Sequence, residues 1–179
     1  MTLEDKNKKI QELALKHASS QTETYRGSVF FPYITLPNAK GKGAMMEEFF
    51  EWYLNEMGVK TELIKTNANY DFIINDTIKV ELKVASIGLG DKVTFNQIHF
   101  GEQKEIDKFL LTILKPNNEI DFFVIPKEDF YSGRIKVLKQ HSSQKEECAR
   151  IQWNYDKMIN ELGFYKIDEE KLGYALTSK

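Results

Sequence analysis

The chain has 179 residues, 41% of them hydrophobic and 12% aromatic, which is enough for one domain with a single substantial core. Charged residues make up 29% of the chain but nearly cancel to a formal net charge of -2, so overall charge does not indicate a nucleic-acid-binding protein. The single cysteine excludes an internal disulfide and a cysteine-rich zinc module. No apolar run reaches the roughly 18 residues of a membrane span, so we expect a cytoplasmic protein without a membrane segment.

The first third of the chain predicts peripheral structure followed by one major helix. Residues 3–18 have the periodicity of an amphipathic helix. Residues 28–43 carry two prolines among scattered apolar residues, so we expect an extended, loop-like segment that ends in a Gly-Lys-Gly turn. From Gly43 to Gly58 the apolar residues have helical spacing without a breaker, and Gly58 stands at the natural C-terminal stop.

The middle of the chain is rich in β-branched residues and predicts a sheet. The expected strands occupy residues 59–65, 70–75, 77–86, 109–115, 120–125 and 134–139. The turn-forming Asn75-Asp76 pair makes the second and third of these a hairpin.

The segments between and after these strands predict helices. The mixed, polar residues 95–109 favour a short helix, residues 126–132 a short helix or turn, and residues 153–162 a helix. Trp52 and Trp153 are expected to be core aromatics. The pattern favours a single α/β domain over residues 1–179, with a mixed central β-sheet flanked by helices.

The predicted hairpin gathers three polar residues. Asp71 begins its first strand, and Glu81 and Lys83 alternate on one face of its second strand. Two carboxylates can hold Mg²⁺, and a lysine beside them can orient the attacking water or neutralise charge on a phosphate. A competing explanation is an ordinary ion pair on a solvated strand, since Glu-x-Lys also occurs at Glu102 and Glu169. Only the copy at Glu81 follows a hairpin turn within an apolar strand.

Here the chain resembles the PD-(D/E)XK nucleases, in which an acidic residue and a hairpin precede Glu-x-Lys. The matching sequence is YDFIINDTIKVELK, with Tyr70 in place of the family's usual proline. An upstream helix with Gly-x-x-x-Glu, found in related junction resolvases and restriction enzymes, is matched from Gly43 to Glu47. The resemblance implies a restriction endonuclease-like fold with a catalytic core at about residues 40–126. It leaves residues 127–179 for DNA recognition or dimerisation.

The resemblance also implies roles for the individual residues. Asp71, Glu81 and the carbonyl of Leu82 would be metal ligands, and Lys83 would act on the attacking water. Glu47 would hold the metal through a water, although an ordinary solvent-facing glutamate is an equally good reading and Glu48 is a competing candidate. The implied cofactor is Mg²⁺, for which Mn²⁺ is expected to substitute, and no organic cofactor is expected.

Downstream polar residues are candidates for contacts with double-stranded DNA. Gln97 is the first choice for a catalytic role near the scissile phosphate, because restriction enzymes of this kind often place a glutamine or asparagine there. The other candidates are polar residues that can contact phosphates and base edges, and each could also be an ordinary surface residue. The DNA-binding candidates are Lys92, Asn96, Gln97, His99, Lys139, Gln140, His141, Ser142 and Lys145.

Three functions remain open at this point. The first is a Mg²⁺-dependent type II restriction endonuclease that acts as a homodimer and cuts a short specific duplex sequence. The second is a structure-specific nuclease, such as a Holliday-junction resolvase or a phage or repair enzyme. The third is a catalytically silent DNA-binding domain of the same fold, which the presence of Asp71, Glu81 and Lys83 disfavours.

Overall fold

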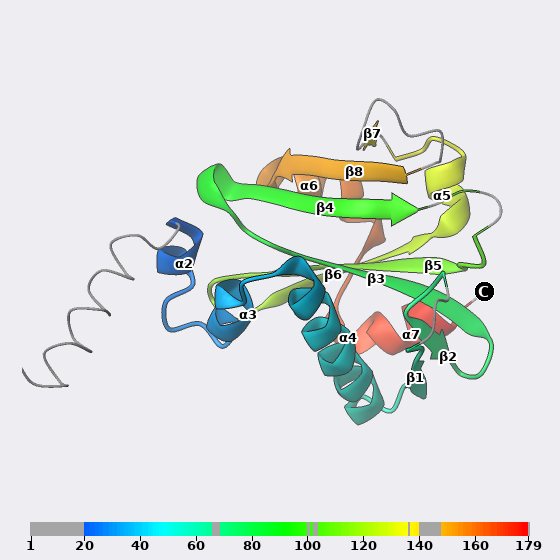
Figure 1. Ribbon diagram of the computed structural model, residues 1–179. Coiled ribbons are helices and arrows are strands. Elements are labelled where there is room, and N and C mark those ends of the chain that lie inside the picture. Colours follow the sequence, from blue (N-terminus) through cyan, green and yellow to red (C-terminus); the bar gives the residue numbers. More distant parts are fainter. Residues whose placement is uncertain are drawn as a thin grey trace, which may run out of the picture.

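The computed structural model describes residues 20–65, 69–99, 101, 104–135, 137–139 and 148–178. Two β-sheets pack on each other, and α4 and α7 cover the outer face of the larger sheet (Figure 1). The strands are β1 (Thr61–Leu63), β2 (Phe72–Ile74), β3 (Ile78–Ser86), β4 (Lys92–His99), β5 (Lys108–Leu114), β6 (Ile120–Pro126), β7 (Leu138–Lys139), β8 (Cys148–Asn154) and β9 (Lys166–Ile167). The α-helices are α2 (Ser20–Thr24), α3 (Phe31–Thr35), α4 (Ala39–Glu56), α5 (Lys127–Tyr131), α6 (Tyr155–Leu162) and α7 (Leu172–Thr177). The 3-10 helices are η1 (Leu89–Asp91), η2 (Gly163–Tyr165) and η3 (Glu169–Lys171).

The larger sheet is mixed and has the strand order β1-β2-β3-β5-β6-β9. The β3 and β5 strands run parallel, and the other neighbours pair antiparallel. The smaller sheet is antiparallel, with the order β4-β8-β7. The predicted α/β architecture, a mixed central sheet flanked by helices, is therefore confirmed. Among the described residues, none of the helices combines the length and apolar character that a membrane span needs.

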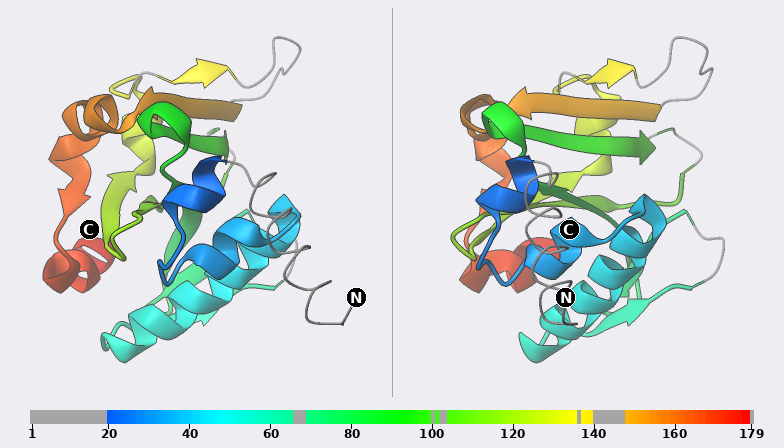
Figure 2. Two further views of the ribbon diagram at one scale, coloured as in Figure 1. Left: turned by 90° about the vertical axis from the view of Figure 1, so that its left-hand side faces the viewer. Right: turned by 60° about the vertical axis from the view of Figure 1, so that its left-hand side comes forward.

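Strand alternation divides the interior into two apolar cores, one on each face of the larger sheet. Leu110 and Leu114 of β5 face the core under α4 and α7. Phe109, Leu111 and Ile113 face the core between the two sheets, which α6 closes (Figure 2). The C-terminal residues belong to both layers, because β8 pairs with β4 and β9 pairs with β6.

Several predicted elements are wrong. Within residues 28–43, expected to be loop-like, Pro32 lies in the first turn of α3, where a helix needs no donor. The α4 helix begins at Ala39, and the Asn38 side chain caps it by accepting from Gly41 N at 2.6 Å. The expected Gly-Lys-Gly turn is therefore part of this helix.

The other corrections concern strands and one tryptophan. The segment expected to be helical, residues 95–109, contains most of β4. The expected strand at 134–139 is reduced to β7, and β8 was not predicted at all. Trp52 is 57% exposed and is not a core residue, whereas Trp153 packs against the core between the sheets. The predicted helix at residues 3–18 lies outside the described residues.

The feature that positions the functional site is the point where β2 stops pairing with β3. Their pairing ends at Phe72 and Val80, so within the described parts of the chain no strand lies beside this edge of β3 from Glu81 onward. The α4 helix lies against one face of β3 and β4 lies near the other. The uncovered edge of β3 therefore lies between α4 on one side and the smaller sheet on the other.

Candidate active site

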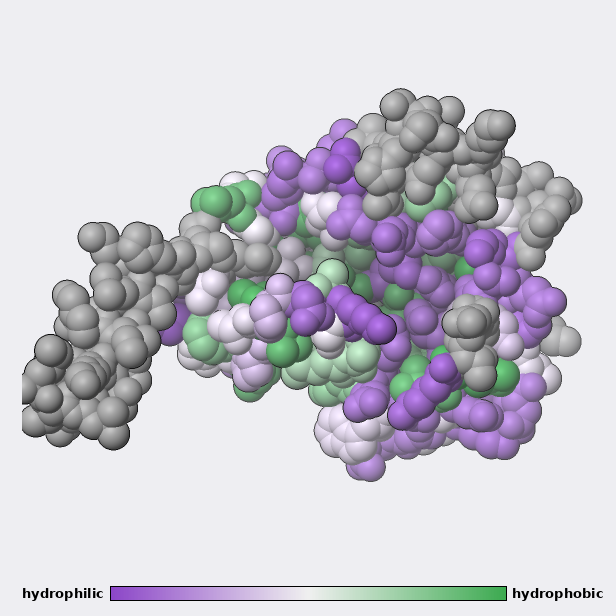
Figure 3. Space-filling model, viewed as in Figure 1, coloured by the Kyte–Doolittle hydropathy of each residue, from purple (hydrophilic) through white to green (hydrophobic). Residues whose placement is uncertain are grey.

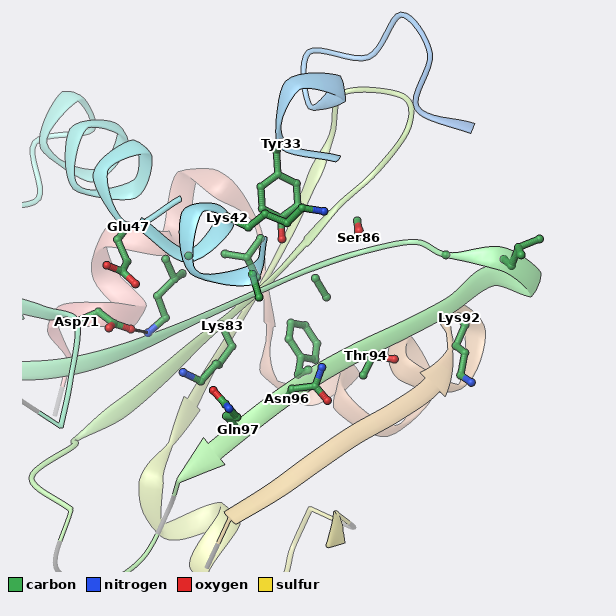
Figure 4. A pocket seen from close by; sticks show the side chains of 18 residues that line it. Tyr33, Lys42, Glu47, Asp71, Lys83, Ser86, Lys92, Thr94, Asn96 and Gln97 are labelled. Carbon is green, nitrogen blue, oxygen red and sulfur yellow. Dashed lines mark hydrogen bonds between the residues drawn. The ribbon is translucent and has the colours of Figure 1, made fainter. Parts of the chain in front are cut away.

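A cleft of about 610 Å³ runs along this uncovered edge of β3 (Figure 4). Side chains enter it from three directions: from α3 and α4, from β3, and from β4 on the opposite wall. Its polar lining consists of Tyr33, Lys42, Glu47, Asp71, Lys83, Ser86, Lys92, Thr94, Asn96 and Gln97. Seven of the residues singled out from sequence therefore meet in one cleft: Glu47, Asp71, Leu82, Lys83, Lys92, Asn96 and Gln97.

Asp71 is fixed by both neighbouring strands and by its own side chain. Its carbonyl accepts from Ile64 N at 2.8 Å, and its amide donates to Val80 O at 3.0 Å. Its Oδ2 accepts a hydrogen bond from Leu82 N at 2.7 Å. Because backbone groups alternate along a strand, the Leu82 amide and carbonyl face the same edge as those of Val80. The carboxylate of Asp71 and the Leu82 carbonyl thus lie on the same uncovered edge of β3.

Glu81 and Lys83 form a hydrogen-bonded ion pair on the face of β3 opposite to Val80 and Leu82. Glu81 is only 9% exposed and lies behind the cleft lining, whereas Lys83 enters the cleft itself. Burial raises the pKa of Glu81 from 4.5 to about 7, against the opposing attraction of Lys83, and repulsion from Asp71 adds to the rise. Burial also raises the pKa of Asp71, which Lys83 and the bond from Leu82 oppose.

Glu47 faces Asp71 from α4 across the cleft (Figure 4). The helix is anchored to β1, because the Asn55 side chain bonds both backbone groups of Thr61 at 2.9 and 3.1 Å. Burial and the charge of Asp71 raise the pKa of Glu47. Glu48, the competing candidate, is exposed and lies 3.6 Å from Lys65, away from the cleft. The geometry thus favours Glu47 as the helix carboxylate of this site.

Asn96 and Gln97 occupy a β-bulge in β4. Phe95 pairs with Ile151 and Ile98 with Ala149, so two residues of β4 lie opposite the single residue Arg150. Gln97 takes a left-handed conformation with a φ of 55°. Consecutive residues of a regular strand point to opposite faces, but the bulge lets both side chains line the cleft. A strained, non-glycine residue of this kind is characteristic of functional sites.

The remaining sequence candidates have different positions. Lys92, the first residue of β4, is exposed and lines the cleft. His99 lies at the other end of β4, where its Nε2 is 3.7 Å from Cys148 Sγ, and it does not line the cleft. Lys139 ends β7. Gln140, His141, Ser142 and Lys145 lie outside the described residues.

Lys42 is a cleft residue that sequence reasoning missed. Its Nζ donates to Ile34 O at 3.0 Å and lies 5.3 Å from the centre of the Tyr33 ring. Burial lowers its pKa. The signal that could have located it is Asn38, a favourable N-cap residue that starts α4 upstream of the expected boundary. Together with Lys83 and Lys92, Lys42 gives the cleft three ammonium groups that suit a polyanion.

The donor atoms of this site suit a hard divalent cation. Within the described part of the chain, no cluster of three or more His, Cys, Asp or Glu side chains could hold a metal ion. Mg²⁺, however, is often held by one or two carboxylates, with waters and substrate phosphate oxygens completing its ligands. Asp71 and Glu81 supply two carboxylates, and a bound cation would offset both the burial that chiefly raises the pKa of Glu81 and the repulsion from Asp71 that adds to it.

Comparison with known proteins identifies a shared fold. No family model and no curated protein sequence matches the chain. Among solved structures, the chain is similar to a bacterial homing endonuclease with a TM-score of 0.51 and 13% sequence identity. The similarity covers 79% of this chain and 93% of that chain. At this identity the similarity shows the fold alone.

Proposed function

We propose that this protein is a Mg²⁺-dependent DNA endonuclease with a PD-(D/E)XK active site, and that it serves as a type II restriction enzyme. The observation that carries the proposal is the convergence of Glu47, Asp71 and Lys83 in one cleft, with Glu81 bonded to Lys83. The fold shared with a homing endonuclease supports the nuclease assignment. DNA is the proposed substrate, and cutting both of its strands would require a second site, which a homodimer would supply.

Asp71, Glu81 and the Leu82 carbonyl would hold the metal, with Glu47 acting through a water. The chemistry that Mg²⁺ supplies when bound is a lower pKa of a coordinated water and neutralisation of phosphate charge. The bond from Leu82 N holds the Asp71 carboxylate at the β3 edge. Glu81 holds the Lys83 ammonium at the cleft. From there Lys83 can orient the attacking water, exchange a proton with it and stabilise charge on the phosphate.

The other cleft residues would bind and orient the nucleic acid. Lys42 and Lys92 approach from opposite walls, so they suit the phosphates on either side of the scissile bond. The bulge directs the Gln97 amide into the cleft, where it can donate to a phosphate oxygen.

The proposal is tested by incubating the full-length protein with supercoiled plasmid and Mg²⁺. Discrete, reproducible fragments are expected for a restriction enzyme, whereas Ca²⁺ should support binding with little cleavage. Random degradation of the plasmid would refute the restriction role. Cleavage of four-way junctions of any sequence, with plasmid left intact, would instead favour a structure-specific nuclease. Binding without cleavage in either ion would identify a catalytically silent domain.

A further inference from the structure

The outer face of the β4–β8 pair presents polar side chains beside the active-site cleft. Along β8, Ala149 and Ile151 are buried, and Trp153 packs against the same core. The residues between them must point outward, because side chains alternate along a strand. We refer to this outward row as the ribbon face, and it consists of Lys92, Thr94, Asn96 and Gln97 from β4 with Arg150, Gln152 and Asn154 from β8.

The chemistry of the ribbon face differs from that of the rest of the chain. The chain has 27 acidic residues among 179, yet neither β4 nor β8 contains one. The face instead offers amides, a hydroxyl and two cations. Hydrophilic surface accordingly covers β4 and β8 on the side where the cleft opens (Figure 3). A face without carboxylates is suited to lie against a polyanion.

Arg150 stands at the centre of this face. It lies opposite Asn96 and Gln97, where the bulge breaks the pairing of β4 with β8. Its Nε is buried and has no hydrogen-bond partner among the described residues. A buried donor without a partner is costly, so an acceptor supplied by a ligand would relieve that cost.

The ribbon face is continuous with the active-site cleft. Gln152 Nε2 donates to Thr94 Oγ1 at 3.2 Å, and Thr94 lines the cleft together with Asn96 (Figure 4). A nucleic acid whose phosphate reaches Asp71 and Lys83 would therefore also meet the strand that carries Thr94 and Asn96.

The dimensions and residue types of this face suit the major groove of duplex DNA. The groove is about 12 Å wide and admits a β-ribbon whose strands lie about 4.8 Å apart, and β7 extends the β4–β8 pair by only two residues, beside Ala149 and Arg150. Arginine pairs bidentately with guanine and glutamine or asparagine with adenine, whereas the minor groove carries a degenerate pattern. We propose that the ribbon face reads base edges in the major groove, with Arg150, Gln152 and Asn96 as the specificity-determining residues. This inference rests on the proposed function and assigns its sequence readout to a surface outside the catalytic carboxylates.

The test measures base preference instead of total activity. A library of duplexes with a randomised central segment is digested with full-length protein and Mg²⁺, and the cut ends are sequenced. Arg150→Ala and Gln152→Ala are each expected to reduce the preference at one or two base positions by about five- to 150-fold. Arg150→Lys keeps the charge but loses the planar fork, so it should relax the same position as Arg150→Ala. This variant also preserves the test if Arg150→Ala does not fold.

Two matched controls separate base reading from loss of charge or of an amide. Arg26→Ala removes an exposed arginine that pairs with Glu23, and Asn160→Ala removes an exposed amide on α6. Both should keep the wild-type base preference. An unchanged preference in all ribbon variants, a uniform loss at every sequence, or equal cutting of all sequences by the wild type would overturn this inference and leave the nuclease assignment intact. If the wild type neither cuts the library nor selects duplexes from it in Ca²⁺, the proposed function fails as well.

Discussion

Replacing Glu81 with glutamine should make the metal-free protein increasingly stable relative to wild type as the pH rises from 4 to 8, while it abolishes cleavage. Two effects act on this carboxyl in opposite directions: the Lys83 ammonium favours its ionised form, and burial disfavours it more strongly. The folded-state pKa of about 7 lies above the ordinary value of 4.5, so the folded protein holds this proton more tightly than the unfolded chain does. Stability should therefore fall as the pH rises through this window, because ionisation of Glu81 costs free energy in the folded state.

The magnitude follows from the difference between these two pKa values. A tenfold change in an equilibrium constant corresponds to about 1.4 kcal/mol. The difference between pKa values of 4.5 and about 7 therefore sets an upper bound of about 3 kcal/mol on the stability that is lost when Glu81 ionises. Glu81→Gln has nearly the same shape and cannot ionise. The difference in free energy of unfolding between variant and wild type should therefore shift in favour of the variant by up to about 3 kcal/mol between pH 4 and pH 8.

Urea denaturation in EDTA, repeated between pH 4 and pH 8, measures this difference directly. The exposed Glu161→Gln on α6 removes the same charge from the surface and should change stability by less than about 0.5 kcal/mol throughout. A Glu81→Gln variant that loses stability relative to wild type as the pH rises would refute the reasoning. It would show that the ion pair with Lys83 outweighs burial and that the pKa of Glu81 is not raised.

Substitutions at three cleft residues, Lys83, Glu47 and Gln97, test their individual roles. Lys83→Ala should lower the single-turnover cleavage rate by about 10²- to 10⁴-fold. Lys83→Arg should not restore this rate, because a guanidinium does not exchange its proton. An active arginine variant would show that only the positive charge of Lys83 matters. Glu47→Ala should reduce the Mg²⁺ affinity or the cleavage rate by about 10- to 100-fold. Glu48→Ala should change neither quantity appreciably in the same Mg²⁺ titration. The reverse result would show that Glu48, and not Glu47, faces the cleft. Gln97→Gly should relieve the strain of the left-handed backbone and raise the free energy of unfolding, measured in urea, by up to about 1 kcal/mol. The same variant should cleave DNA more slowly, because it lacks the side-chain amide. An unchanged cleavage rate would show that this amide has no role in the reaction.

The sequence was sufficient for the β2–β3 hairpin because its signals are local. Phe72 and Ile74 are apolar and alternate with Asp71 and Ile73, and the structure buries the first two completely. The face shared by Glu81 and Lys83 follows from the same alternation. To predict that Glu81 and Lys83 lie near Glu47, one must know which face of α4 points toward β3. The sequence did not decide this and left both Glu47 and Glu48 as candidates.

The second sheet was missed for a physical reason that the bulge explains. Val93 and Phe95 alternate as a strand should, but the two bulge residues delay the next buried residue until Ile98. The resulting spacing of three between Phe95 and Ile98 imitates a helix. Sequence periodicity alone cannot distinguish a bulged strand from a helical turn, and here the distortion is what brings Asn96 and Gln97 into the cleft.

The β8 strand was missed although its pattern is regular. Ala149, Ile151 and Trp153 alternate with polar residues, but a long polar stretch precedes them and α6 follows directly. Pairing with β4 is a long-range contact, and no local signal specifies it. Arg150 could be identified as a candidate only from this pairing, because the register of β4 with β8 is what places Arg150 opposite the bulge.

The most direct test of the central claim is the single-turnover cleavage rate of an Asp71→Ala variant on a duplex that the wild type cuts, measured in saturating Mg²⁺. Asp71 contributes a carboxylate at the β3 edge, and among the described residues its side chain makes one hydrogen bond, which it accepts from Leu82 N, so its loss should abolish cleavage while Ca²⁺-supported DNA binding persists. Asp168→Ala, which removes an exposed carboxylate far along the chain, should cut at the wild-type rate. Cleavage by Asp71→Ala within a few-fold of wild type would contradict a metal-dependent active site at this position.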